Sequence, residues 1–413
     1  MKSDTREGLR ALSKQTHGEG ANLTRITELR RRRRARKLRS ALLLAAAVLA
    51  VAAYFTGVYS EALAAAGEAF DSVRIALAPA AGWPVKTGVP EVVQLEGLAG
   101  GFVELGKQDL VVYSGGGNRL RSIQHGYARP ALSAGNSRFC IYSRAGYELR
   151  VESRSRTLST QTFDRPILLA EMSPNGSLAV VTDSSRYMAE LTIYDPAFRF
   201  RYAWNPTEKE GLPSRIAFAA DNKRFAVACL TAENGSLTSN IFLLDTRSDQ
   251  VSARITASGG QVLQMHWLTA DKLLVIYDHM AAVYDPATGE QKAVFSYGGE
   301  QLVSASVCGQ NAALLFGPEL ADSPARLVVL DPQMQLLADA RVPAPARGVV
   351  CTRTAAYILR ESSVAAYTLA GEADWEAALD APPLAVLDAK QLLVFAGGEA
   401  RALTGPETGG AQE

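Results

Sequence analysis

One short phrase, in which bulky apolar residues precede an aspartate, recurs four times in this sequence. The copies are "LTIYDP" (191–196), "FLLDT" (242–246), "AVYDP" (282–286) and "VVLDP" (328–332). Their aspartates, Asp195, Asp245, Asp285 and Asp331, are 50, 40 and 46 residues apart. A repeat of ~40–50 residues with about four strand-like runs is typical of β-propeller blades. The spacing therefore predicts an all-β propeller.

The four aspartates are expected to shape turns. An Asp side chain bonds the backbone two residues on, and a following Pro presets φ for a tight turn. We therefore place all four in the hairpin between the third and fourth strand of a blade. The same assignment argues against reading them as catalytic acids or calcium ligands.

Strand-like runs separated by Gly, Asn, Asp and Pro continue from Trp83 to about residue 405. They divide into units near 89–124, 128–163, 166–205, 212–256, 261–297, 301–342, 346–380 and 383–404. The last unit has only three runs, and "WPVKTG" (83–88) could supply a fourth and close the ring without an exposed edge. Eight blades is the predicted number, and seven is the alternative.

The first 60 residues differ in character from the rest. Residues 1–39 hold 13 Lys and Arg against 4 Asp and Glu, whereas the remainder holds 30 against 38. No charge occurs from Ser40 to Ser60, a run that as a helix would extend about 30 Å, the thickness of a bilayer's hydrocarbon core. We expect a single transmembrane helix, with its basic flank in the cytoplasm.

Two alternatives to this anchor remain. A buried core helix would explain the apolar run, and "ALA" (62–64) resembles the cleavage site of a signal peptide. The long basic region favours the uncleaved anchor. The expected division is a cytoplasmic tail (1–39), a transmembrane helix (40–60), a helical stalk (61–82), an extracytoplasmic propeller (83–405) and a disordered tail (406–413).

Several segments together resemble a known family. The anchor followed by "GGFVEL", "QHGYARP", "SPNGSLAVVT", "RYMAELTIYDP" and "SLTSNIFLLD" is similar to single-pass membrane proteins of domain-of-unknown-function family 5711 from Gram-positive bacteria. The resemblance implies a tethered extracytoplasmic propeller and no particular activity. The blades resemble WD-repeat and quinoprotein-like propellers more distantly. The signature residues of those two groups are missing, so none of their binding residues carry over.

The sequence offers no motif for catalysis, metal binding or a cofactor. It has four histidines and no HExxH, GxSxG or Walker pattern. His266 lies in an inner-strand run and is expected to be a core or channel residue. The four cysteines form no CxxC pair, and burial as free thiols is expected. Cys308 and Cys351 are the candidate pair if a disulfide exists.

The linker "QHGYARP" (124–130) is the candidate partner-binding segment. His125, Tyr127 and Arg129 would lie on a rim of the propeller, and Tyr and Arg are common interface anchors. The alternative is that Tyr127 packs on the first blade and Arg129 caps a strand.

Three functions fit the sequence. The first is a membrane-anchored scaffold for a protein or cell-wall partner. The second is a sensor that signals through its cytoplasmic tail. The third is a surface hydrolase or lyase with carboxylates at one mouth of the channel. Nucleic acid is not an expected ligand, because the acidic remainder lacks clustered Lys and Arg.

Overall fold

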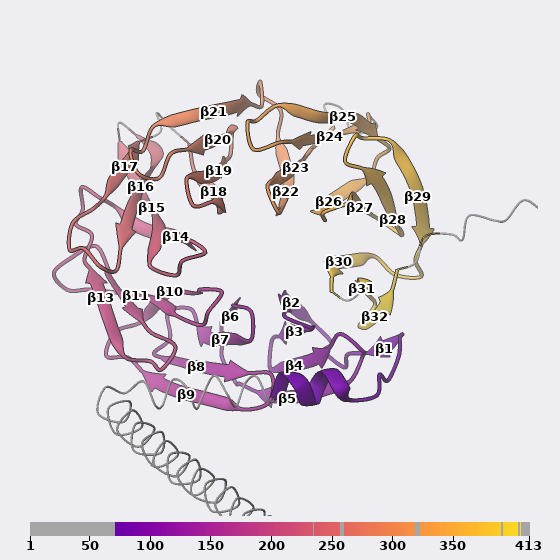
Figure 1. The fold of residues 1–413 in the computed structure, drawn as a ribbon, viewed down its shortest axis with the longest axis horizontal. Helices are drawn as coiled ribbons and strands as arrows, with labels where there is room; N and C mark the ends of the chain where they lie inside the picture. The colour runs from indigo at the N-terminus through magenta and orange to yellow at the C-terminus, as the bar shows by residue number, and fades with distance from the viewer. Residues whose placement is uncertain are drawn as a thin grey trace, which may run out of the picture. The chain divides into compact units, whose positions relative to one another are not determined.

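The computed structural model describes residues 71–233, 235–256, 260–318, 323–389, 391–403 and 405. After a helix over residues 71–77, this part of the chain forms eight four-stranded antiparallel sheets. Figure 1 shows the sheets as blades around a central axis, with the first strand of each blade innermost. The prediction of an all-β propeller with eight blades is confirmed.

The strands follow one another along the chain, four to a blade. Blades 1 to 4 comprise β2 (Val92–Leu98), β3 (Gly101–Gly106), β4 (Asp109–Ser114) and β5 (Arg119–Gln124); β6 (Pro130–Ala134), β7 (Arg138–Ser143), β8 (Glu148–Ser153) and β9 (Thr157–Thr162); β10 (Ile167–Met172), β11 (Leu178–Thr182), β12 (Glu190–Tyr194) and β13 (Phe200–Trp204); and β14 (Leu212–Phe218), β15 (Arg224–Glu233), β16 (Ser236–Asp245) and β17 (Ala253–Thr256). Blades 5 to 7 comprise β18 (Val262–Thr269), β19 (Lys272–Tyr277), β20 (Met280–Tyr284) and β21 (Gln291–Ser296); β22 (Leu302–Cys308), β23 (Asn311–Phe316), β24 (Ala325–Leu330) and β25 (Leu336–Val342); and β26 (Ala346–Cys351), β27 (Ala355–Arg360), β28 (Ser363–Thr368) and β29 (Ala373–Ala378).

Blade 8 joins the two ends of the propeller. It comprises β30 (Pro383–Asp388), β31 (Leu392–Ala396), β32 (Glu399–Ala402) and, as its outer strand, β1 (Val85–Lys86). Val85 pairs with Ala400, and Lys86 pairs with Glu399. The prediction that "WPVKTG" closes the ring is confirmed, and β32 is thereby covered along its outer edge.

The turns follow the local chemistry of the sequence. The carboxylates of Asp195, Asp245, Asp285 and Asp331 accept hydrogen bonds from the backbone N–H two residues on, over 2.9, 2.9, 2.9 and 2.8 Å. Turns between first and second strands use residues with positive φ, Gly176 at 90° and Asn222 at 56°. Only glycine, and less readily Asn, enters this region at low cost, which ties both turns to their residue types.

The hydrophobic core lies between neighbouring blades. Side chains alternate across each strand, so each blade has two apolar faces and packs against two neighbours. The interface of blades 4 and 5, for example, buries Ile241, Leu243, Leu273 and Val275. Because every blade needs both neighbours to bury its faces, closure of the ring by β1 supports all eight.

Inner strands of neighbouring blades are linked by side chains. Gln94 of β2 donates to the carbonyl of Leu132 over 2.8 Å, and Gln264 of β18 donates to that of Ala305 over 3.1 Å. A serine accepts from the next blade in other places, as where Met172 N–H donates to Ser133 over 2.8 Å. These bonds satisfy backbone groups on strand edges that have no neighbouring strand to pair with.

The described residues contain no helix long and apolar enough to cross a membrane. The expected transmembrane helix (40–60), the basic tail (1–39) and the tail from residue 406 onward lie outside the described residues. The same is true of the expected stalk before residue 71.

Candidate functional site

The propeller has two unlike faces. We call one the linker face, because it carries the connections from the outer strand of each blade to the inner strand of the next. Inner strands begin there, and the turns between second and third strands return to it, because the strands are antiparallel. We call the opposite one the turn face. It carries the turns between first and second and between third and fourth strands.

A β-bulge interrupts the start of seven of the eight described inner strands, at the linker face. The residues skipped by the pairing are Val93, Leu168, Ser214, Leu263, Val303, Arg347 and Leu384. A bulge leaves its extra residue unpaired and re-aims the side chain. The pairing of β6 shows no such shift.

Four of these residues form an exposed arc at the linker-face end of the inner strands. They belong to the consecutive blades 6, 7, 8 and 1: Val303 is 46% exposed, Arg347 is exposed, Leu384 is 56% exposed and Val93 is 47% exposed. Arg347 pairs with Glu361 over 3.1 Å. We call these four residues the apolar arc. Apolar side chains that gather on a surface, rather than lying scattered, are typical of interaction sites.

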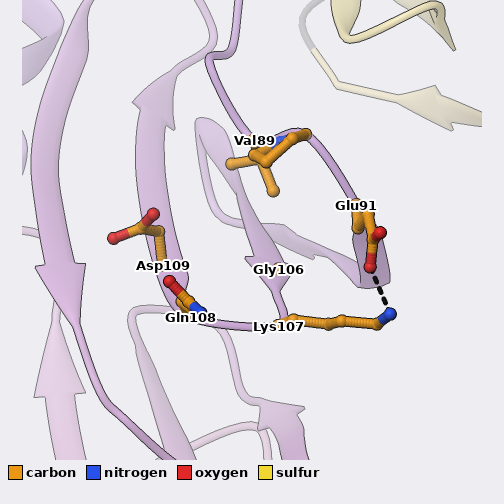
Figure 2. Close-up of a pocket in the computed structure, with 7 residues that line it drawn as sticks. Val89, Glu91, Gly106, Lys107, Gln108 and Asp109 are labelled. Carbon is orange, nitrogen blue, oxygen red and sulfur yellow. Dashed lines mark ion pairs between the residues drawn. The ribbon is translucent and has the colours of Figure 1, made fainter.

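A pocket of about 380 Å³ opens on the same face, at the blade 1 end of the arc. Figure 2 shows the lining residue Val89 and the ion pair between Glu91 and Lys107. The walls come from the linker into blade 1 and from the turn at Gly106–Asp109 between β3 and β4. The pocket therefore adds a charged pair to a surface whose other members are mostly apolar.

The structure places the predicted rim residues next to this pocket. The backbone of His125 donates to the carbonyl of Gln108 over 3.0 Å, and its Nε2 bonds the carbonyl of Gly106 over 3.2 Å. Nδ1 accepts from the N–H of Tyr127 over 3.0 Å, so Nε2 carries the proton. Burial lowers the pKa of His125, which keeps the ring neutral.

Tyr127 and Arg129 differ in burial and in the internal bonds that their side chains make. Tyr127 is half-buried against the interface of blades 1 and 2, and its hydroxyl donates to Glu148 over 2.7 Å. Burial, together with this bond, raises the pKa of Tyr127. Arg129 is exposed, and its guanidinium makes no hydrogen bond or ion pair with the described residues. Of the three predicted residues, Arg129 is the one free to contact a partner without giving up an internal bond.

A second group of polar residues lies further along the inner strands, three positions after four of the seven bulges. Glu96 of blade 1, Glu171 of blade 3, His266 of blade 5 and Ser306 of blade 6 occupy this position. The apolar residues Ala217, Val350 and Leu387 occupy it in blades 4, 7 and 8, where they pack against the clusters between blades.

Two members of this group, Glu96 and Glu171, have carboxyl groups with raised pKa values, and we call this pair the carboxyl layer. Burial raises the pKa of Glu171 to about 8, with a smaller contribution from the nearby charge of Glu96 and a partial offset from a hydrogen bond to Ser133. Burial also raises the pKa of Glu96. The charge of Arg215 lowers the pKa of Glu171 by less than burial raises it, and the Arg215 guanidinium donates its hydrogen bond to the carbonyl of Leu263 over 2.9 Å. At neutral pH, Glu171 is therefore largely protonated and can donate a hydrogen bond.

Glu171 and His266 line a pocket of about 390 Å³ at the turn-face mouth of the channel. The walls also include Phe218, Trp267 and Asn136, from blades 4, 5 and 2. Burial lowers the pKa of His266, and its Nε2 bonds the side-chain oxygen of Gln264 over 3.1 Å. No group of three or more His, Cys, Asp or Glu suited to a metal ion occurs in the described part of the chain.

The sequence led us to predict His125, Tyr127 and Arg129 as rim residues, and it gave no signal for the apolar arc or for the carboxyl groups of Glu96 and Glu171. The position of a bulge in an inner strand cannot be recognised from the sequence, because bulges require no particular turn residue and the bulge residues of the different blades are not all of one residue type. Glu96 and Glu171 come from different blades, so only closure of the ring brings them to the same channel.

A family model described as "Family of unknown function (DUF5711)" matches residues 85–399. The chain belongs to this family. The match extends from the first residue of β1 to the first residue of β32, so this DUF5711 region includes parts of all eight blades and both sides of the ring closure.

Several solved structures share the fold of this DUF5711 chain. The C-terminal WD40 domain of Sif2 is 13% identical, with a TM-score of 0.57, and the match covers 78% of this chain and 99% of that one. BamB from Moraxella catarrhalis is 12% identical, with a TM-score of 0.54 and coverage of 78% and 98%. The computationally designed Ika8 protein is 9% identical, with a TM-score of 0.57 and coverage of 77% and 98%. At these identities the likeness concerns the fold alone, and no curated protein matches the sequence.

Proposed function

We propose that this chain is a membrane-tethered binding module whose propeller lies outside the cytoplasm and captures a protein partner on its linker face. The observation that carries the proposal is the apolar arc. Four consecutive blades carry an exposed bulge residue at the linker-face end of the inner strand, and three of the four are Val or Leu. An apolar surface that carries charged groups, here Arg347 within the arc and Glu91 and Lys107 beside it, suits a protein partner better than a polysaccharide.

The entry of the chain into the propeller supports this choice of face. The helix over residues 71–77 packs against the turn face, where the guanidinium of Arg154 donates to the hydroxyl of Ser72. Asn118, in a turn of the same face, donates to the carbonyl of Pro79 over 2.9 Å. The described chain therefore begins on the turn face, which leaves the linker face uncovered by this segment.

The tether itself rests on the sequence. A charge-free run of 21 residues follows a strongly basic segment, and the positive-inside rule keeps such a segment in the cytoplasm. Confinement to a membrane surface raises the effective concentration of the propeller toward other surface components. A modest intrinsic affinity would then suffice for stable capture.

The test compares partner capture by three variants in cells, by crosslinking followed by mass spectrometry. Leu384→Glu and Val303→Glu place a charge in the apolar arc, and we expect each to remove the crosslinked partner while leaving the melting temperature within a few degrees. Leu336→Glu is the matched control, because Leu336 is 52% exposed but lies on outer strand β25.

The linker-face proposal fails if the arc variants keep the partner, or if the control loses it to the same extent. The substitution Arg129→Ala is a second test of partner binding at the linker face. Because the Arg129 side chain is exposed and makes no hydrogen bond or ion pair with the described residues, we expect this variant to capture less partner at an unchanged melting temperature.

The carboxyl layer favours a second candidate, a surface hydrolase or lyase. Glu171, largely protonated at neutral pH, could act as a general acid, and pairs of carboxyl groups serve glycoside cleavage. We would incubate the full chain with soluble cell-wall polysaccharide and measure reducing ends. Activity lost in Glu171→Gln but kept in Glu91→Gln would support this candidate, and no release by the unaltered protein would end it.

A further inference from the structure

We propose that Cys308 and Cys351 are a disulfide site that joins the inner strands of blades 6 and 7. Both are free thiols in the structure, as are Cys140 and Cys229. Cys308 ends β22 and Cys351 ends β26, so the bond would link two blades at the turn-face mouth of the channel.

The register of the two strands places Cys351 beside Ser306, one side-chain position before Cys308 on the same face of β22. The N–H of Val349 donates to the hydroxyl of Ser304 over 3.2 Å, and the N–H of Cys351 donates to that of Ser306 over 3.0 Å. Each contact joins residues 45 positions apart, so β22 and β26 run side by side in one register. Cys308 follows Ser306 by two residues and therefore points to the same neighbouring blade.

Both side chains lie in the same interface between blades. Cys351 belongs to the apolar cluster between blades 6 and 7, and Cys308 packs against that cluster. Both the backbone and the thiol of Cys308 influence the pKa of the Cys351 thiol, so the two residues are close neighbours. By contrast, Cys140 and Cys229 are each buried in a separate cluster, in blades 2 and 4.

The two thiols differ in access. Cys308 is half-buried, and Cys351 is 6% exposed. Burial raises the pKa of both, that of Cys351 to about 11. The thiolate of Cys308 is therefore expected to attack a disulfide or diazene oxidant first, and Cys351 then displaces the reduced oxidant. In total the two thiols lose two protons and two electrons, which the oxidant takes up.

Whether the disulfide forms in cells depends on the compartment that contains the propeller. Disulfides persist in oxidising surroundings and are rare in the cytosol. If the propeller is extracytoplasmic, as proposed above, the pair should be oxidised in cells. That expectation rests on the proposed function, whereas the ability of the two sulfurs to bond does not.

The first experiment tests the bond itself. The purified full chain is treated with diamide or oxidised glutathione, its remaining thiols are alkylated under denaturing conditions, and its peptides are mapped without reduction. We expect loss of two thiols, a Cys308–Cys351 peptide, and a melting temperature raised by on the order of 5–10 °C, because a closed loop restricts the unfolded chain.

Two variants complete this experiment. Cys308→Ser should abolish both the crosslinked peptide and the oxidant-dependent rise in melting temperature. The double variant Cys140→Ala with Cys229→Ala should keep both. Four free thiols after oxidation, or a bond to Cys140 or Cys229, would overturn the proposed disulfide.

The second experiment tests the compartment. Intact cells are treated with acid to trap thiols and alkylated before lysis. Oxidised Cys308 and Cys351 would support both proposals. A pair that bonds in the purified protein but is reduced in cells would leave the disulfide site intact and count against an extracytoplasmic propeller.

Discussion

Gln94 and Leu132, on the inner strands of blades 1 and 2, form a reciprocal pair of hydrogen bonds. The side-chain amide of Gln94 donates to the carbonyl of Leu132 over 2.8 Å, and its oxygen accepts from the N–H of Leu132 over 3.1 Å. The amide thus imitates the two bonds of a β-bridge across a gap in which no strand lies. Blades in this propeller are therefore joined by specific polar contacts as well as by apolar packing.

Gln94→Ala should lower the free energy of unfolding by about 2 kcal/mol, because Leu132 is buried and both of its backbone groups lose their partner. Denaturant unfolding measures the change. Gln291→Ala, at an exposed site on outer strand β21, is the control and should change stability by less than about 0.5 kcal/mol. Equal effects of the two substitutions would contradict a bridging role for Gln94.

The repeated aspartates should contribute unequally to stability. Asp195 is 5% exposed, accepts two backbone bonds over 2.9 and 2.8 Å, and pairs with Arg199 and Arg201. Asp285 is more exposed and accepts from the N–H of Ala287 over 2.9 Å. We expect Asp195→Ala to cost about 2–3 kcal/mol and Asp285→Ala about 1 kcal/mol. Thermal melting would measure both.

A catalytic role for these aspartates makes the opposite prediction. Substitution of Asp285 would then abolish the cellular phenotype while leaving the melting temperature unchanged. The turn assignment requires that any loss of function follows the loss of stability, and Asp249→Ala, at an exposed site nearby, should affect neither.

Glu104 should make stability depend on pH. This carboxyl is 1% exposed on β3, and one of its oxygens has no partner among the described residues. Burial raises its pKa from 4.5 to about 7, with a partial offset from a hydrogen bond to Thr87. A raised folded-state pKa means that its contribution is complete below pH 4.5 and is lost as the pH rises through about 7.

Between pH 4.5 and pH 8, ionisation of Glu104 should therefore cost about 2–3 kcal/mol. Glu104→Gln removes the titrating group, so the variant should match the unaltered protein near pH 5 and exceed its melting temperature at pH 8. Glu91→Gln, on the surface, should follow the unaltered protein throughout. A variant that is no more stable than the unaltered protein at pH 8 would contradict this account.

Ring closure should depend on β1. Val85 and Lys86 pair with β32, and the N–H of Thr87 donates to the carbonyl of Gly398 over 3.0 Å. A fragment that begins at Val89 lacks these contacts and should melt lower, or aggregate, relative to one that begins at Ala78. Calorimetry and light scattering would compare the two. Equal stability would show that β1 contributes little to closure.

The membrane orientation can be checked by labelling. Single cysteines placed at Ser13 and at exposed Asp374, in a chain without its native cysteines, are treated in intact cells with an impermeant thiol reagent. We expect labelling at position 374 only, because the basic run flanks only the N-terminal end of the apolar segment. Labelling at position 13 would reverse the orientation.

The sequence by itself determined the repeat, the turns and the closing strand. Asp285 is followed by Pro, Asn175 by Gly, and strand-like runs alternate at regular spacing, all of which are local signals that act over a few residues. The eight units read from them agree with the eight blades because each blade is built from consecutive strands. The closing segment was recognisable because the last unit lacked a strand.

Only the tertiary structure determined which residues of different blades share a surface or a channel. Val303 and Leu384 became part of one arc only because both are exposed bulge residues and the ring places blades 6 and 8 on either side of blade 7, which carries Arg347. Glu96 and Glu171 share a channel, and Glu171 is largely protonated at neutral pH, because closure buries groups that no local pattern links. The physical reason is that side-chain exposure and pKa depend on neighbours from other blades, whereas turns and strands depend on neighbours in sequence.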